Sequence, residues 1–103
     1  MLSHEKNSRI HLAATIIVVL LSAWLKISTL QWAVISIVIG MVWAAELLNT
    51  AIEAYFNLVH PEKSDLVKAG KDSAAGAVLV CALISVVVGL LILGPALFHK
   101  LIG

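Results

Sequence analysis

The sequence contains little charge and only one cysteine. Of its 103 residues, 13% are Asp, Glu, Lys or Arg, and the formal net charge is +1. The single cysteine, Cys81, excludes an intrachain disulfide, and we expect it to be a small packing residue. The small net charge and the lack of a basic run with interleaved aromatics give no support for nucleic-acid binding.

The common signatures of soluble nucleotide and hydrolytic enzymes are also absent. A Walker loop ending at Gly70-Lys71 would need glycine at position 65, which is Asp65. The sequence has no Gly-x-Gly-x-x-Gly, no cysteine pair for zinc and no nucleophile elbow. Any chemistry must therefore use another set of side chains.

Long apolar runs are abundant, with 61% of the residues hydrophobic. This excess predicts one small all-α integral membrane unit covering residues 1–103. The runs predict three transmembrane helices, at about 10–30, 31–59 and 74–98. The hydrophilic stretch at 60–73 is expected to be a connecting loop or a short surface helix. A cleaved signal peptide is the alternative for the first run, but Glu5 weakens the basic start and two further spans follow.

Local signals mark the ends and the packing face of these spans. His60-Pro61 is a plausible stop for the second span, because the residue before proline avoids helical angles. Gly94-Pro95 should end or kink the third. Small residues recur every fourth position along the third span, a pattern typical of close helix packing in membranes. They are Ser73, Ala77, Cys81, Ser85 and Gly89.

The basic residues predict the orientation. Five lie on the side of the N-terminus and the 60–73 loop (Lys6, Arg9, Lys63, Lys68, Lys71), and two on the other side (Lys26, Lys100). The excess places the N-terminus and the loop in the cytoplasm. Trp24 and Trp32 would then flank the outer interface and Tyr55 the inner one, while Trp43 would pack against a neighbour.

The second span ends in a polar stripe. In a helix, five polar side chains of this span fall within one sector about 100° wide. They are Glu46, Asn49, Thr50, Glu53 and Asn57. An ionisable group in hydrocarbon costs at least ~2.5–3.5 kcal/mol on insertion scales, so the stripe indicates a polar function at one end of this helix.

The residues alone leave several functions open. Mg²⁺ takes oxygen ligands, often one or two carboxylates plus substrate phosphates, and Glu5 and Glu53 could be such a pair. Lys71 could balance phosphate charge, and Glu46 could accept a proton from an alcohol in the bilayer. A small proton- or cation-coupled transporter using Glu46 is an equally good interpretation, and a non-catalytic assembly subunit is a third.

Three motifs, in order, resemble those of the prokaryotic diacylglycerol kinase family. The first is Glu5-Lys-Asn-Ser-Arg-Ile-His-Leu12 and the second is Glu46-Leu-Leu-Asn-Thr-Ala-Ile-Glu53. The third, Lys71-Asp-Ser-Ala-Ala-Gly-Ala-Val78, begins eighteen positions after Glu53. The likeness runs from Glu5 to about Pro95. The residues of the second and third motifs are more similar to those of the undecaprenol kinase branch than to those of the enterobacterial diacylglycerol kinase branch.

The resemblance implies a three-helix kinase of the bacterial inner membrane, usually a homotrimer, that moves the γ-phosphate of ATP-Mg²⁺ onto a lipid hydroxyl. The lipid would be undecaprenol or diacylglycerol. The roles that the resemblance implies are catalysis by Glu46 and Asn49, metal binding by Glu5 and Glu53, ATP binding by Glu5, Glu53, Glu62, Lys71 and Asp72, and lipid binding by Arg9, His11 and Glu46.

Other polar residues are expected to be solvated or interfacial. For Lys63, Asp65 and Lys68 the expectation is a solvated loop, and for His4, His60 and His99 an interfacial or solvated position.

Two departures from the family pattern bear on activity. Family members usually carry an amphipathic surface helix before the position of Glu5, whereas four residues precede Glu5 here. The family often has aspartate at the position of Asn57, so this site carries one charge fewer. The lipid and nucleotide sites could thus be incomplete, and an inactive truncated homologue is an alternative to an active kinase.

Overall fold

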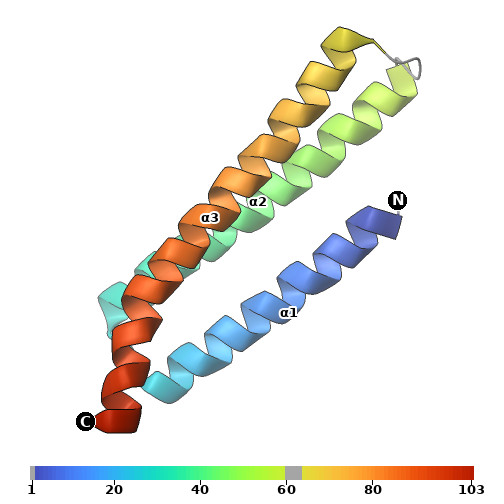
Figure 1. The fold of residues 1–103 in the computed structure, drawn as a ribbon. Coiled ribbons are helices and arrows are strands. Elements are labelled where there is room, and N and C mark those ends of the chain that lie inside the picture. Colours follow the sequence, from blue (N-terminus) through green and yellow to red (C-terminus); the bar gives the residue numbers. More distant parts are fainter. Residues whose placement is uncertain (1, 60–63) are drawn as a thin grey trace.

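The structure, a computed structural model, describes the backbone of residues 2–59 and 64–103, and the side chains of the same ranges from residue 8 onward. It contains α1 (Leu2–Leu25), α2 (Thr29–Val59) and α3 (Asp65–Ile102), and no strand within those ranges (Figure 1). All three helices are long and apolar enough to cross a membrane. The expected all-α architecture with three spanning helices is confirmed.

Helix α3 begins earlier than the apolar pattern indicates. Residues 65–73, expected in the hydrophilic stretch, form its first turns, and residues 60–63 of that stretch lie outside the described ranges. Ser64 is the N-cap, and its side-chain oxygen accepts a hydrogen bond of 3.1 Å from the backbone N–H of Val67. Asp65 occupies the first turn, where a negative charge is favoured. The charged segment is therefore a capped helical start. Of the two alternatives, a loop or a short surface helix, residues 65–73 are helical, and this helix is continuous with the third span.

A three-residue turn joins α1 to α2, and it explains why α1 ends at Leu25 and not near residue 30. Ile27 N donates to Ser22 O at 3.4 Å and Lys26 N donates to Ala23 O at 3.2 Å. This is the Schellman pairing, with Lys26 in the left-handed position at φ 55°. The turn thus satisfies the last carbonyls of α1 without glycine.

Ser28, the last residue of the turn, caps the start of α2 in a capping box with Gln31. Ser28 Oγ accepts from Gln31 N at 3.2 Å, and Gln31 Oε1 accepts from Ser28 N at 3.0 Å. The two side chains satisfy donors that the first helical turn leaves without partners. Both helix ends at this turn are therefore fixed by local hydrogen bonds.

Helix α3 continues through Gly94 and Pro95 to Ile102, so the prediction that it could end there was wrong. Its 38 residues span roughly 57 Å at 1.5 Å per residue, more than the ~30 Å hydrocarbon core. Near its C-terminus Lys100 Nζ lies 3.4 Å from Trp24 O and 5.0 Å from the centroid of the Trp24 ring. This contact connects the end of α3 to the end of α1.

The best-packed region surrounds the α1–α2 turn. Ile27, Ile35 and Leu93 are buried there, and residues of all three helices pack against them. From this end α2 and α3 run side by side, while α1 diverges toward its N-terminus (Figure 1). Gly70 marks a close approach at the far end, because a Cβ there would lie 2.9 Å from a ring carbon of Phe56.

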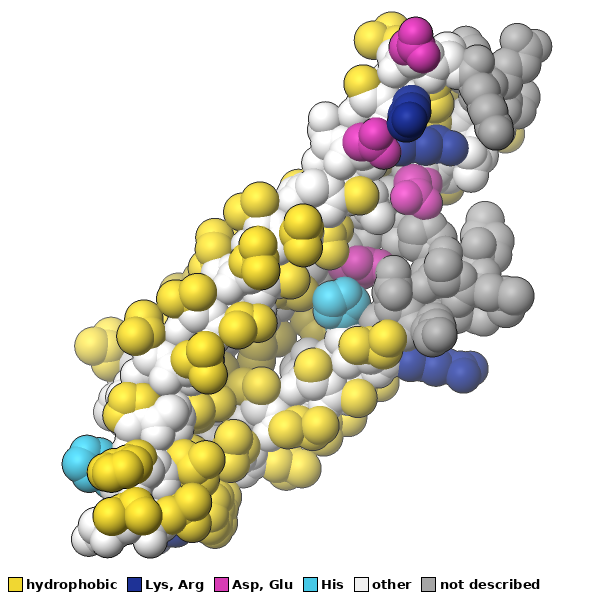
Figure 2. All heavy atoms as spheres, viewed as in Figure 1, with side chains coloured by type: hydrophobic (Ala, Val, Ile, Leu, Met, Phe, Trp, Pro, Cys, Tyr) yellow, Lys and Arg dark blue, Asp and Glu magenta, His cyan; other side chains and the backbone are white. Residues whose placement is uncertain are grey.

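The surface is mainly apolar over the middle and lower part of the molecule, and charged side chains gather near the α2–α3 connection (Figure 2). The seam of small residues is only partly buried within the chain. Cys81, Ser85 and Gly89 are half-buried, whereas Ser73 and Ala77 are exposed. The bundle is elongated, measuring 58 × 20 × 20 Å.

Candidate functional site

Two polar side chains are buried on one face of α2. Glu46 is 3% exposed and Asn49 is 8% exposed, and the two lie three positions apart, on adjacent parts of a helix surface. Glu46 Oε1 and Asn49 Oδ1 have no hydrogen-bond partner among the described residues. Buried polar atoms are normally paired, so this pair suggests a place where a ligand supplies the partner.

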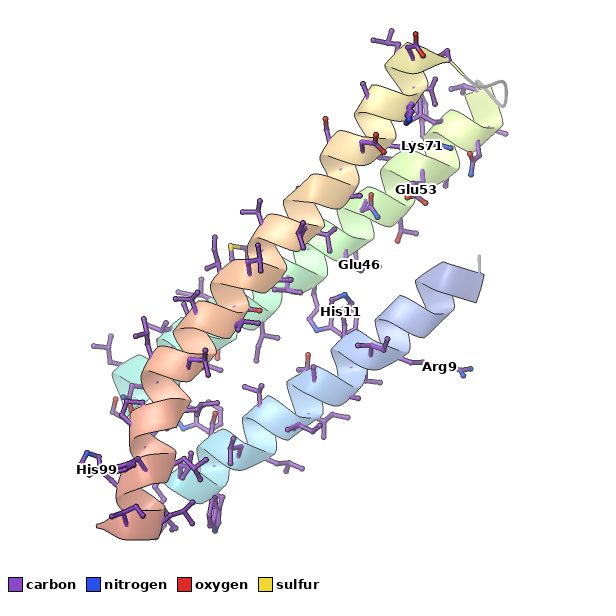
Figure 3. The ribbon with its side chains drawn as sticks, viewed as in Figure 1. Arg9, His11, Glu46, Glu53, Lys71 and His99 are labelled. Atoms are coloured by element: carbon purple, nitrogen blue, oxygen red, sulfur yellow. The ribbon has the colours of Figure 1, made fainter. Side chains whose placement is uncertain are left out.

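His11 of α1 faces this pair (Figure 3). Its Nε2 lies 3.5 Å from Glu46 Oε2, so the imidazole stands beside the carboxylate oxygen that is not the orphaned one. The separation is longer than an ordinary hydrogen bond of about 2.7–3.2 Å. Such contacts at catalytic carboxylates often shorten when substrate binds.

Two further residues connect α1 to α2 at the same level. Thr15 Oγ1 donates to His11 O at 2.7 Å and accepts from Trp43 Nε1 at 3.0 Å. The Trp43 and His11 rings are tilted by 59° with centroids 6.0 Å apart. Trp43, expected to pack against a neighbour, is thus hydrogen-bonded to α1 beside the histidine.

A second group of polar residues lies closer to the α2–α3 connection. Glu53, two helical turns beyond Glu46, is half-buried. Lys71 Nζ of α3 donates to Asn57 Oδ1 of α2 at 2.7 Å. Asp72 is exposed beside Lys71. The arrangement gives a buried carboxylate in the middle of the bundle and a more polar, solvent-facing group nearer its end (Figures 2 and 3).

The predicted site residues are only partly brought together. Glu46, Asn49 and His11 form one group, and Lys71 meets Asn57 in another. Arg9 is exposed and points away from α2 and α3 (Figure 3). The Glu5 side chain and Glu62 lie outside the described residues.

The described residues include no group of three or more His, Cys, Asp and Glu side chains able to hold a metal ion by themselves. Glu53 offers an oxygen donor of the kind that Mg²⁺ prefers. Because Mg²⁺ commonly uses one or two protein carboxylates and completes its shell with phosphate oxygens and water, this donor set fits a metal shared with a nucleotide.

An apolar pocket of about 140 Å³ lies between the three helices. His11, Thr15 and Trp43 form its most polar part, and small residues of α3 border it on another side. His11, which lies beside Glu46, lines the pocket, whereas Glu46 and Asn49 themselves do not.

Sequence reasoning did not find Thr15 or the role of Trp43. Trp43 is three positions before Glu46, which puts the two on neighbouring parts of one helix surface. That spacing was a usable signal for Trp43. The spacing of Thr15 from His11 gives no comparable indication, since a threonine commonly bonds the carbonyl four residues earlier in any helix.

Comparison with known proteins gives one family and two curated relatives. The model of the family described as "Prokaryotic diacylglycerol kinase" matches residues 1–93. The undecaprenol kinase of Bacillus subtilis (strain 168) is 43% identical over 93 residues, which cover 90% of this chain and 76% of that protein. The diacylglycerol kinase of Synechocystis sp. is 35% identical over 99 residues, which cover 95% of this chain but only 57% of that protein. No solved structure matches the chain.

Proposed function

Since this chain belongs to the prokaryotic diacylglycerol kinase family, we propose that it is a membrane kinase that phosphorylates the hydroxyl group of a lipid with ATP and Mg²⁺. The substrate we favour is undecaprenol, with diacylglycerol as the second candidate. The preference follows the relative of which the chain covers the larger share, 76% against 57%.

The observation that carries the proposal is the buried pair Glu46 and Asn49. A carboxylate that is 3% exposed, with one oxygen unpaired among the described residues, is suited to accept the proton of an alcohol held in the bilayer. Asn49 Oδ1, also without a described partner, is a second unpaired acceptor on the same face of α2. The tail of the lipid stays in hydrocarbon while its hydroxyl reaches this pair.

The nucleotide would bind nearer the α2–α3 connection. Lys71 supplies positive charge for phosphate, and Asn57 holds its ammonium group at 2.7 Å. We assign Asp72 and Glu62 to the same nucleotide site, and Glu53 with Glu5 to the metal. Bound there, Mg²⁺ would neutralise phosphate charge that builds up during transfer.

The proposed reaction needs no covalent enzyme intermediate. The lipid oxygen bonds to the γ-phosphorus of ATP, the bond from that phosphorus to the β–γ bridging oxygen breaks, and ADP leaves. Glu46 takes the hydroxyl proton. Catalysis then rests mainly on positioning and on charge stabilisation, as is usual for phosphoryl transfer.

The charge distribution supports a bacterial inner-membrane location with the α2–α3 connection in the cytoplasm. Lys68 and Lys71 lie at that end, with Arg9 near the start of α1, while Lys26 and Lys100 lie at the opposite end. Basic residues favour the cytoplasmic side, where ATP is available. We also propose an oligomer, because three helices can hardly enclose this many polar groups. That the oligomer is a homotrimer rests on the family resemblance alone.

The test is transfer of labelled γ-phosphate from ATP to undecaprenol and to diacylglycerol, compared side by side in vesicles containing the purified full chain. Phosphorylation of either lipid, dependent on Mg²⁺ and lost in Glu46→Gln, is the expected result. Absence of transfer to both lipids would contradict the proposal. Solute uptake driven by a pH gradient without ATP would favour a transporter instead.

A further inference from the structure

The Glu46 carboxylate lies beside the His11 side chain of α1, and His11 belongs to a small network. His11 Nε2 lies 3.5 Å from Glu46 Oε2, and its backbone carbonyl accepts a hydrogen bond from Thr15 Oγ1 at 2.7 Å. Trp43 of α2 donates its indole N–H to the same Thr15 hydroxyl at 3.0 Å. The chain of contacts thus runs from α2 to α1 and back to α2.

We infer that Trp43 and Thr15 are positioning residues that hold the His11 imidazole against Oε2 of Glu46, so that Oε1 is left to take the proton of the alcohol. This inference rests on the proposed function and assigns roles to two residues that the proposed reaction does not itself use. His11 acts on Glu46, and Trp43 and Thr15 act through His11.

The geometry supports this division of the two carboxylate oxygens. Glu46 is 3% exposed, so water cannot readily orient its carboxylate, and Oε1 has no partner among the described residues. The imidazole, whose Nε2 lies 3.5 Å from Oε2, restricts the rotation of the carboxylate on that side. Small displacements of a catalytic group can lower the rate about 100-fold. A network that holds the carboxylate in one orientation would therefore have a measurable effect on turnover.

Trp43 is suited to hold His11 in two ways. Its indole N–H bonds to Thr15, one helical turn from His11, and its ring lies 6.0 Å from the imidazole centroid at a tilt of 59°. The ring therefore limits the rotation of the imidazole, while the N–H sets the distance between α1 and α2 at this level. α1 and α2 otherwise make few close approaches.

The kinetic test separates the two parts of the Trp43 side chain. Trp43→Phe keeps an aromatic ring but removes the N–H, and Thr15→Val keeps the shape but removes the hydroxyl. We expect each to lower kcat about tenfold, with KM for ATP changed less than about twofold, because the base is displaced while the nucleotide site is not. Trp24→Phe is the matched control: its side chain lies at the other end of α1, and kcat should stay unchanged.

A double-mutant cycle then distinguishes positioning from simple loss of stability. In a His11→Leu background, Trp43→Phe should cause no further loss, because its effect passes through the histidine. His11→Gln, which retains an N–H donor, should keep more activity than His11→Leu. Losses that multiply across the cycle, or an unchanged kcat in Trp43→Phe, would overturn the inference.

A second readout does not depend on turnover. The indole N–H signal of Trp43 in NMR spectra of the ¹⁵N-labelled full chain should move in Thr15→Val, while those of Trp24 and Trp32 stay in place. An unmoved Trp43 signal would overturn the network even in an active enzyme. Failure of the native chain to phosphorylate either lipid would instead count against the proposed function, so the two failures are distinguishable.

Discussion

Lys71 of α3 donates a hydrogen bond of 2.7 Å to Asn57 of α2, and this contact joins the two helices at the end where the charged side chains gather. A neutral amide orients the lysine without neutralising its charge, which leaves the ammonium group available for phosphate.

Replacing Asn57 by alanine should therefore affect nucleotide binding more than stability. We expect KM for ATP to rise about threefold, the effect of losing one modest hydrogen bond. The unfolding midpoint should hardly change, because the contact is exposed. In a Lys71→Met background Asn57→Ala should add nothing to KM, and a further rise there would contradict this role.

Glu46→Gln removes the proposed base while keeping its size. We expect kcat to fall by about 10²–10⁴-fold, the usual contribution of a positioned general base, with ATP binding largely retained. Steady-state kinetics and nucleotide binding to the purified protein measure the two effects. Asp65→Asn, which changes an exposed carboxylate in the first turn of α3, is the matched control and should keep turnover.

Glu53→Gln tests whether Glu53 is a ligand of the proposed Mg²⁺. Loss of one carboxylate oxygen ligand should raise the Mg²⁺ concentration that gives half-maximal rate by about tenfold, the order seen when a metal site loses a supporting group. Excess Mg²⁺ should recover most of kcat. A Mg²⁺ dependence identical to that of the native chain would remove Glu53 from the metal site.

The capping box at the start of α2 gives a prediction about stability. Ser28→Ala removes the acceptor of the Gln31 N–H and should lower the free energy of unfolding by about 1 kcal/mol. Ser36→Ala changes an exposed serine of the same helix and should shift it by less than about 0.5 kcal/mol. Equal shifts of the unfolding midpoint in the two variants would show that the cap contributes nothing.

The three helices were predictable because each contains an apolar run too long for any other structure in a membrane. The start of α3 was only partly predictable, because the charged composition after Ser64 fits either a loop or a short surface helix. The serine cap and the buried Val67 show that it is helical. The end of α1 was also missed. The Ser28–Gln31 spacing signals a helix start, but a lysine in the left-handed position gives no sequence signal for the turn before it.

The site was predictable where one helix contains it. The spacing of Glu46, Asn49 and Glu53 puts them on one side of α2, and burial of the first two agrees with that pattern. Contacts between helices were not predictable, because they depend on how α1 lies against α2. The Thr15–Trp43 hydrogen bond joins residues 28 positions apart, and neither residue is unusual in a membrane helix.

The turn at Lys26–Ser28 sets the direction in which α1 leaves α2, because local hydrogen bonds fix both helix ends that meet there. His11 lies roughly 21 Å along α1 from this turn. A change of about 5° in the direction of α1 would therefore move its imidazole by nearly 2 Å relative to Glu46. That displacement is large enough to separate the two groups. Substitutions in a turn far from the reacting atoms thus have the leverage to change turnover.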